Sequence, residues 1–176
     1  MKTEMQTEIN GTLTELLQLL STFDQEQINV IPFEGSWTAG QLAKHLIMSG
    51  SGLVELMNGA VRETEREPDE HIQTIKTVFL DFSTKLESPD FVKPPMVYNY
   101  NKVDWLSSLK DIKAGINQAI ETLDLTKTCV AFEIPVLGFL TRLEAIHFVL
   151  YHTQRHIQQL KKIFRTLVNN NSLSLL

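Results

Sequence analysis

The sequence predicts an all-α protein, a four-helix bundle with an additional short helix or a long crossover connection. Four long stretches, within residues 5–22, 38–57, 103–123 and 141–168, carry apolar residues three and four positions apart, the spacing of one buried helix face. Glycine and proline are sparse, at 8 and 6 of 176 residues, which favours regular structure over a disordered or fibrous chain. Amphipathic helices of this kind pack around a shared core as a bundle.

Length and charge narrow the class of protein. A chain of 176 residues fits one domain, which we expect over residues 1–168, followed by a C-terminal tail over 169–176. The net charge of −5 argues against binding to nucleic acid or to an anionic membrane, because such binding depends on basic residues. The N-terminus has no signal-peptide pattern, and no apolar run approaches the roughly 20 residues of a membrane span. We therefore expect a soluble, cytoplasmic protein.

The first two helices are separated by a loop. The first, over residues 5–22, has one apolar face. The second begins after Thr38, because Gln41 three residues later completes a capping box that satisfies free amide groups, and it extends to about Met57. Trp37, just before the cap, is interpreted as a hydrophobic staple at the helix entry, with stacking on a ligand as the alternative.

The middle of the chain contains a third helix and a long connection. The helix is expected to end near Ser88. Its apolar stripe consists of Ile72, Ile75, Phe79, Phe82 and Leu86. Three prolines within residues 89–102 exclude a continuous helix there, because proline lacks the amide donor and restrains the residue before it. This connection is long enough to cross the bundle, and the fourth helix follows from about Val103 to Leu123.

The last helix is expected to be the longest. The segment before it, residues 129–140, is short and interrupted by a proline and a glycine, and it has no evident partner strand. We interpret it as a packed loop. Thr141 and Glu144 form a second capping box, and the helix then runs without a break to about Val168.

Two histidines lie on the apolar face of this last helix. At about 100° per residue, His152 and His156 fall within the same stripe as Val149, Leu160 and Ile163. The other half of the helix is polar, and its His147 points away from the core. The polar half comprises Glu144, His147, Tyr151, Gln154, Arg155, Gln158, Lys162 and Arg165.

These two histidines and a third predict a metal site. His152 and His156 are four residues apart, so both imidazoles can reach one ion. His45 faces inward on the second helix, and the small residues within 49–52 leave space for a ligand cavity or a close backbone approach. Three neutral imidazoles suit zinc, nickel, copper or iron, with zinc or nickel favoured, and leave positions open for water or substrate.

Other interpretations of these residues remain open. Buried histidines also occur as hydrogen-bonded core residues without a metal. His71 stands beside acidic residues at a helix start, and His147 lies on the polar face, so both are interpreted as surface residues, with a role beside the site as the alternative for His147. The single cysteine, Cys129, is interpreted as a small buried residue, because nothing in its sequence context would lower its pKa and make it a nucleophile.

The segments GSWTAGQLAKHL and LGFLTRLEAIHFVLYHTQRHIQQL resemble the DinB superfamily, related to YfiT-type proteins, and the resemblance covers nearly the whole chain in order and spacing. It implies a four-helix bundle with up-down-down-up connectivity and a metal held by one histidine of the second helix and two of the last. Here these are His45, His152 and His156. Many relatives carry an acidic residue within the last histidine motif, where this chain has Thr-Gln-Arg, so a nearby acid or base is missing.

The resemblance also implies two classes of function. Some relatives are metal-dependent transferases that join low-molecular-weight thiols to electrophiles, and others are isomerases or hydrolases. We therefore expect a metal-dependent enzyme with a small-molecule substrate, a thiol S-transferase or hydrolase whose metal activates a thiol or water. A low-molecular-weight thiol would then be a further cofactor. The alternative is a non-catalytic metal-binding or ligand-sensing bundle that acts through a homodimer, since relatives often dimerise.

Overall fold

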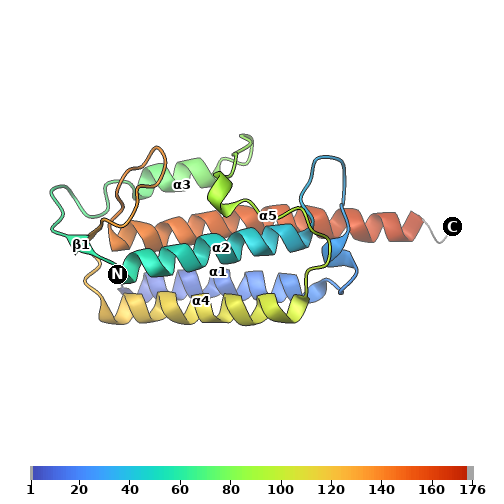
Figure 1. Ribbon diagram of the computed structural model, residues 1–176, viewed down its shortest axis with the longest axis horizontal. Helices are drawn as coiled ribbons and strands as arrows, with labels where there is room; N and C mark the ends of the chain where they lie inside the picture. Colours follow the sequence, from blue (N-terminus) through green and yellow to red (C-terminus); the bar gives the residue numbers. More distant parts are fainter. Residues whose placement is uncertain (1, 174–176) are drawn as a thin grey trace.

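The computed structural model describes residues 2–173, whose helices form an elongated bundle (Figure 1). Four long helices make the bundle and a shorter one packs against the last of them, so the expected all-α class and four-helix bundle are confirmed. The helices are α1 (Lys2–Thr22), α2 (Ala39–Asn58), α3 (Ile72–Leu80), α4 (Lys102–Thr122) and α5 (Arg142–Leu173). The other regular elements of the described chain are the 3₁₀ turns η1 (Gln27–Asn29) and η2 (Asp90–Val92) and the strands β1 (Val61–Arg62) and β2 (Thr128–Cys129).

The long helices have up-down-down-up connectivity, as the resemblance implies. The colour gradient of Figure 1 shows α1 and α5 running in one direction and α2 and α4 in the other. Contacts between helix ends agree with these directions. Lys102 at the start of α4 donates to the carbonyl oxygens of Ser21 and Phe23 at the end of α1. Arg142 at the start of α5 donates to the carbonyl oxygen of Met57 near the end of α2.

Both expected capping boxes are present. At the start of α2, the Thr38 hydroxyl accepts from the backbone N–H of Gln41 at 3.1 Å, and the Gln41 side chain accepts from the backbone N–H of Thr38 at 3.0 Å. Thr141 and Glu144 make the same two hydrogen bonds at the start of α5, at 3.1 Å and 2.9 Å. These caps set where α2 and α5 begin, and therefore which of their residues face the core.

The third helix is shorter than expected. It ends at Leu80 instead of near Ser88, and the last two apolar residues of the predicted stripe lie outside it, with Phe82 57% and Leu86 37% exposed. The physical reason is Asp81, whose carboxylate accepts hydrogen bonds from the residues that follow it. Such a local turn competes with helical hydrogen bonding.

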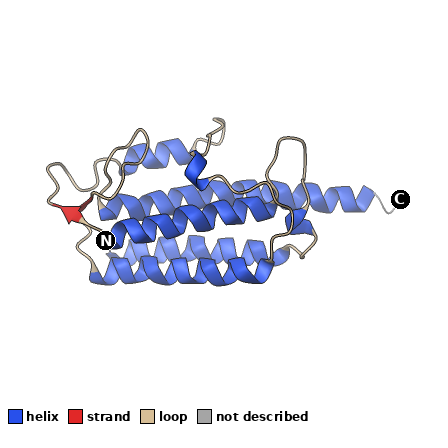
Figure 2. Ribbon diagram, viewed as in Figure 1, coloured by secondary structure: helices blue, strands red, loops and turns tan. Residues whose placement is uncertain are grey.

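The segment before α5 differs from the sequence prediction at its first residue. Thr128 and Cys129 form the strand β2, which pairs antiparallel with β1, so the interpretation of Cys129 as part of a packed loop is wrong. The pairing joins Val61 to Cys129 and Arg62 to Thr128. Figure 2 shows how small this strand pair is beside the helices. Two residues per strand are too few to produce an alternating pattern, and the partner lies in a polar segment after α2.

The last helix continues to Leu173, beyond its expected end near Val168. Residues 174–176 of the expected C-terminal tail lie outside the described residues. Within the described chain, none of the helices combines the length and the apolar character needed to cross a membrane.

Helix α5 is buried on two faces. One face contributes to the apolar core, and α3 packs against another. For this reason Glu144, Tyr151 and Arg155, which belong to the polar half of the helical wheel, are buried, with 0%, 7% and 6% of their surface exposed. Buried charged groups need hydrogen-bonding or ionic partners. The partners of Glu144 lie in the segment before α3, and those of Arg155 lie at the C-terminal end of α3 and just after it.

Candidate metal centre

The structure brings together the three histidines that the sequence predicts as metal ligands. His45 lies on α2, and His152 and His156 lie one turn apart on α5, which contacts α2. The Nε2 atom of His152 lies 3.0 Å from that of His45 and 2.9 Å from that of His156. All three residues are buried, with at most 7% of their surface exposed. They are referred to below as the histidine cluster.

Two of the three imidazoles are held from behind by an oxygen atom. Nδ1 of His45 lies 2.8 Å from the carbonyl oxygen of Val92, and Nδ1 of His156 lies 2.5 Å from Oε1 of Gln159. Carbonyl and amide oxygens only accept hydrogen bonds, so both Nδ1 atoms carry the proton and both Nε2 atoms present a lone pair. Metal-binding histidines are commonly oriented by a partner of this kind on the other ring nitrogen.

The histidine cluster holds more acceptors than donors. Because neutral His45 and His156 carry their protons on Nδ1, only His152 can supply a proton between the three Nε2 atoms. Nε2 of His152 lies 3.0 Å from Nε2 of His45 and 2.9 Å from Nε2 of His156, and each of these two atoms presents a lone pair. One N–H group donates well to only one of them. A positive ion placed among the three nitrogens would be attracted by all of them.

The spacing of the nitrogens fits such an ion. Two nitrogens bound to one zinc ion at about 2.1 Å lie about 3.0–3.4 Å apart for bond angles of about 90–109°. The observed separation of 3.0 Å lies at the lower end of this range, and that of 2.9 Å lies about 0.1 Å below it. The three ligand atoms also lie within 4.8 Å of one another, so the histidine cluster can hold a metal ion.

Burial keeps the three imidazoles uncharged. It lowers the pKa of His45 from 6.5, against the opposing effect of the Val92 hydrogen bond. Burial likewise lowers the pKa of His152 far below 6.5 and that of His156 to about 3, and the positive charge of Arg155 acts in the same direction on both. Metal ions bind neutral imidazole, so this environment leaves the nitrogen lone pairs available at neutral pH.

Aromatic rings surround the histidine cluster. The ring centroid of Trp37 lies 5.3 Å from that of His45, and those of Phe79 and Phe148 lie 5.2 Å and 5.6 Å from that of His152. Trp37, which the sequence assigns to a hydrophobic staple, thus lies directly against the predicted site. Aromatic side chains around a site exclude water and so strengthen the attraction between a cation and its ligands.

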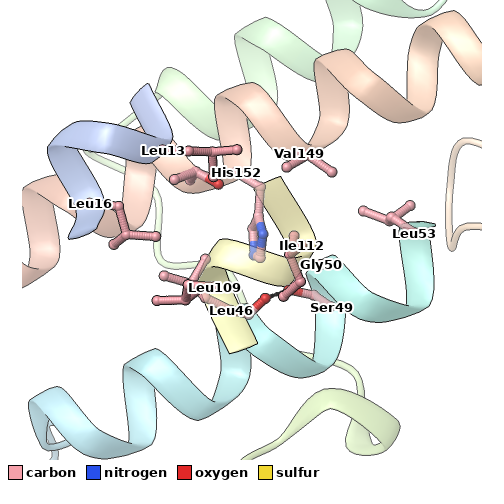
Figure 3. A pocket seen from close by; sticks show the side chains of 11 residues that line it. Leu13, Leu16, Leu46, Ser49, Gly50, Leu53, Leu109, Ile112, Val149 and His152 are labelled. Carbon is pink, nitrogen blue, oxygen red and sulfur yellow. Dashed lines mark hydrogen bonds between the residues drawn. The ribbon is translucent and has the colours of Figure 1, made fainter. Parts of the chain in front are cut away.

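A small cavity adjoins the histidine cluster on the side of the bundle core. Its volume is about 10 Å³, room for roughly one water molecule, and the imidazole of His152 projects into it (Figure 3). Ser49 and Gly50 line it, as expected for the small residues of α2. Gly50 also lets α4 approach, since a Cβ atom there would lie 3.1 Å from Ile112. The remaining walls are mostly apolar: Leu13, Leu16, Leu46, Leu53, Leu109 and Val149.

The other candidates from the sequence do not join the histidine cluster, which is the one group of three potential metal ligands among the described residues. Nδ1 of His147 lies 2.9 Å from the carbonyl oxygen of Leu143 on the same helix. His71 precedes α3, and its backbone N–H donates to Glu144. Cys129 is fully buried, and this burial raises the pKa of its thiol to about 11. A thiol with such a pKa is a poor nucleophile.

Sequence reasoning missed the two groups that bond to Nδ1 of His45 and His156, and it missed the burial of Arg155 beside His156. Val92 acts through its backbone carbonyl, which every residue type has, so no sequence signal marks it. Gln159 follows His156 by three residues on the same helix, and this spacing does predict that the two side chains are neighbours. Arg155 lies on the polar half of the wheel, where its burial depends on the packing of α3.

Known proteins with a similar sequence or structure support the same architecture. Residues 8–160 match the DinB superfamily. A crystal structure described as TT2238, a four-helix bundle protein, superposes with a TM-score of 0.57 and 16% sequence identity, over 92% of this chain and 99% of that chain. At this identity the likeness shows the fold alone. No curated protein matches the chain.

Proposed function

The chain belongs to the DinB superfamily, and on this basis we propose that it is a divalent-metal-dependent enzyme with a small-molecule substrate. His45, His152 and His156 would hold the ion, with zinc or nickel as the expected metals. The reaction would be the transfer of a low-molecular-weight thiol to an electrophile, or a hydrolysis. The observation that carries the proposal is the convergence of three neutral imidazole nitrogens on one point.

The chain would hold and orient the catalytic group rather than supply the nucleophile. A bound divalent ion provides Lewis acidity that lowers the pKa of a thiol or water beside it. Three protein ligands leave a coordination position for that nucleophile. Val92 and Gln159 keep the Nε2 atoms of His45 and His156 directed inward through their hydrogen bonds to Nδ1. The ring of Trp37 shields the same region from water.

The substrate would approach from the outer face of the bundle, because the inner cavity of about 10 Å³ is too small for an organic molecule. The connection between α3 and α4 crosses that outer face, where Phe91 and Met96 are 65% and 73% exposed. Met96 accepts a hydrogen bond on Sδ from Gln41, one turn before His45 on α2. Exposed apolar side chains beside a polar centre suit a substrate whose reactive group is attached to an apolar body.

The residues around His152 and His156 favour deprotonation of the nucleophile by the charge of the ion over deprotonation by a side-chain base. No carboxylate belongs to the histidine cluster in the described structure. Of the three residues between His152 and His156, Arg155 is engaged with backbone carbonyl groups at the end of α3. A thiol or water would therefore lose its proton because of the charge beside it rather than to a positioned base.

The first test is metal content together with activity. Protein purified without chelators should contain close to one divalent ion per chain by mass spectrometry of the elements. The metal-loaded protein is then assayed for thiol transfer to monobromobimane and for ester hydrolysis, before and after treatment with a chelator. The variant His152→Ala should lose both metal and turnover. His147→Ala is the matched control, because His147 lies on the same helix outside the histidine cluster.

Two results would decide the matter. Chelator-sensitive turnover in the wild type and in His147→Ala, but not in His152→Ala, supports the proposal. A wild-type protein that takes up neither zinc nor nickel contradicts it. The non-catalytic alternative predicts that the wild type takes up metal but shows no turnover for His45→Ala to abolish, whereas a catalytic metal predicts turnover that His45→Ala loses.

A further inference from the structure

Arg155 is a buried arginine whose guanidinium group binds main-chain carbonyls. It lies on α5 immediately before His156 and is 6% exposed. Its Nη1 atom donates to the carbonyl oxygens of Phe79 at 3.2 Å and Asp81 at 2.7 Å, and its Nη2 atom donates to that of Thr84. The planar guanidinium presents several donors in a fixed fork, which suits it to hold three carbonyls at once.

These carbonyls mark the start of the connection between α3 and α4, residues 81–101, referred to below as the strap. The Asp81 carboxylate accepts hydrogen bonds from the backbone N–H and the hydroxyl of Ser83, at 3.0 Å and 2.5 Å, and from the hydroxyl of Thr84 at 2.7 Å. These bonds lower the pKa of Asp81 to about 2. The strap therefore begins with a well-defined turn, and Arg155 attaches this turn to α5.

The far end of the strap is attached to the loop after α1. The carbonyl oxygen of Tyr100 accepts from the side-chain amides of Gln25 at 2.6 Å and Asn29 at 3.1 Å, and its backbone N–H donates to Oδ1 of Asn29 at 2.8 Å. The Tyr100 ring lies on Gly40 of α2, where a Cβ atom would be 2.6 Å from it. Both ends of the strap are thus tied to the bundle.

Between these ends the strap meets the bundle at the histidine cluster. The Val92 carbonyl, midway between Thr84 and Tyr100, accepts from Nδ1 of His45 at 2.8 Å. Near it Pro94 is buried and Val92 itself is half-buried, but Phe91, Lys93 and Pro95 are exposed, so only limited burial holds this part of the strap in place. Besides the hydrogen bond from Gln41 of α2 to Met96, the position of the Val92 carbonyl consequently depends on the attached ends.

We propose that Arg155 is a positioning residue for His45. By holding the start of the strap on α5, it keeps the Val92 carbonyl against Nδ1 of His45 and so keeps the Nε2 lone pair of His45 directed at His152 and His156. The effect on the tautomer of His45 does not require a metal. Only the resulting effect on metal affinity rests on the proposed function.

Arg142 provides a matched control on the same helix. It is 9% exposed and donates to the carbonyl oxygens of Met57 at 2.7 Å and Asp124 at 3.3 Å. These two carbonyls lie near the ends of α2 and α4, away from the strap. Loss of either arginine leaves one buried and at least one partly buried carbonyl without this donor and lowers stability. Only the loss of Arg155 should change the environment of His45.

The test compares Arg155→Gln and Arg142→Gln in the metal-free state. Correlation spectra of the imidazole ring nitrogens report which nitrogen of His45 carries the proton, with the His45 signals assigned from a His45→Gln variant. The wild type and Arg142→Gln should show His45 protonated on Nδ1. Arg155→Gln should show a mixture of both tautomers. Its zinc affinity, measured by competition with a chromophoric chelator, should fall about 10–100-fold, as is usual when a group that orients a ligand is lost.

An unchanged His45 spectrum in Arg155→Gln would overturn the inference. An equal change in Arg142→Gln would also overturn it, because the effect would then follow from lost stability alone. Should Arg155→Gln not fold, Arg155→Lys takes its place with the same outcomes, since lysine keeps the charge but lacks the planar fork. Failure of the wild type to bind either zinc or nickel would contradict the proposed function, while the tautomer comparison would still test the role of Arg155.

Discussion

Two polar clusters are buried along α5, and they differ in how completely their hydrogen bonds are paired. Near the start of the helix, the Glu144 carboxylate accepts from Nη1 and Nη2 of Arg66, both at 2.6 Å. It also accepts from the backbone N–H groups of His71 at 2.8 Å and Thr141 at 2.9 Å. In this glutamate cluster each carboxylate oxygen meets two donors, and its negative charge meets a positive one.

The histidine cluster, further along the same helix, has more hydrogen-bond acceptors than donors. Three ring nitrogens face one another, and with Nδ1 of His45 and His156 protonated, at most one proton lies among them. A fully paired buried cluster stabilises a fold and has no capacity for a further ligand. The excess of acceptors in the histidine cluster is the property that a cation would satisfy. The same helix therefore carries one polar cluster whose hydrogen bonds are fully paired and one that could hold a cation.

Breaking the glutamate cluster should cause the largest loss of stability. Glu144→Ala leaves the Arg66 charge and two backbone N–H groups without their acceptor, and we expect the free energy of unfolding to fall by about 3–5 kcal/mol. Urea denaturation followed by circular dichroism measures it. Glu15→Ala is the control, because Glu15 forms an exposed ion pair with Lys161 at 2.7 Å, and its loss should cost at most about 1 kcal/mol. Equal losses of unfolding free energy in Glu144→Ala and Glu15→Ala would contradict a special structural role of the glutamate cluster.

Filling the histidine cluster should raise stability by a smaller amount. At a free zinc concentration of about 100 times the dissociation constant, the gain should be about 2.7 kcal/mol, because only the folded chain brings the ligands together. Zinc should have this effect on His147→Ala and not on His152→Ala, as measured by thermal and urea unfolding. Stabilisation of His152→Ala by zinc to the wild-type extent would place the ion elsewhere.

Acidification should affect the two clusters in different pH ranges. The folded pKa of His156 is about 3, below its ordinary value of 6.5, so below pH 6.5 the unfolded chain binds a proton that the folded chain does not. The metal-free protein should therefore lose stability as the pH falls below 6.5, by about 1 kcal/mol at pH 5.5 for His156 alone. The His156→Gln variant should lack this contribution, and an identical pH profile for the variant and the wild type would contradict it.

The glutamate cluster should respond only in more acidic solution. Arg66 and the backbone N–H groups of Thr141 and His71 lower the pKa of Glu144 below 4.5, against the opposing effect of its burial, which is the largest single influence. Its contribution to stability is present above pH 4.5 and is lost as the pH falls through 4.5 towards the folded pKa. Unfolding curves at several pH values should separate the loss of stability due to His156 from the loss due to Glu144.

The sequence was sufficient for the main features of the fold and for the members of the candidate site. The capping boxes at Thr38 and Thr141 fix the starts of α2 and α5, and helical periodicity then turns His45, His152 and His156 inward. Local rules suffice here, because each histidine is placed by its own helix. That α2 and α5 are neighbours with facing histidines was suggested by bundle packing and by the family resemblance.

The sequence was insufficient where the structure depends on contacts between distant segments. The end of α3 at Leu80 depends on the Asp81 turn and on Arg155, which is far away in the chain. The strand pair at Cys129 needs a partner after α2, and the hydrogen bond between Val92 and His45 uses a backbone atom that has no sequence signal. Helical periodicity describes one element at a time and contains no information on such pairings.

The proposed metal site is tested most directly by the position of a metal in a crystal of the zinc- or nickel-loaded protein. Anomalous diffraction at the absorption edge of that metal locates the ion independently of the protein coordinates. We expect one strong peak at about 2.0–2.1 Å from the Nε2 atoms of His45, His152 and His156, with the Val92 carbonyl still at Nδ1 of His45. A peak at another position, or ligation of the ion through Nδ1, would contradict it.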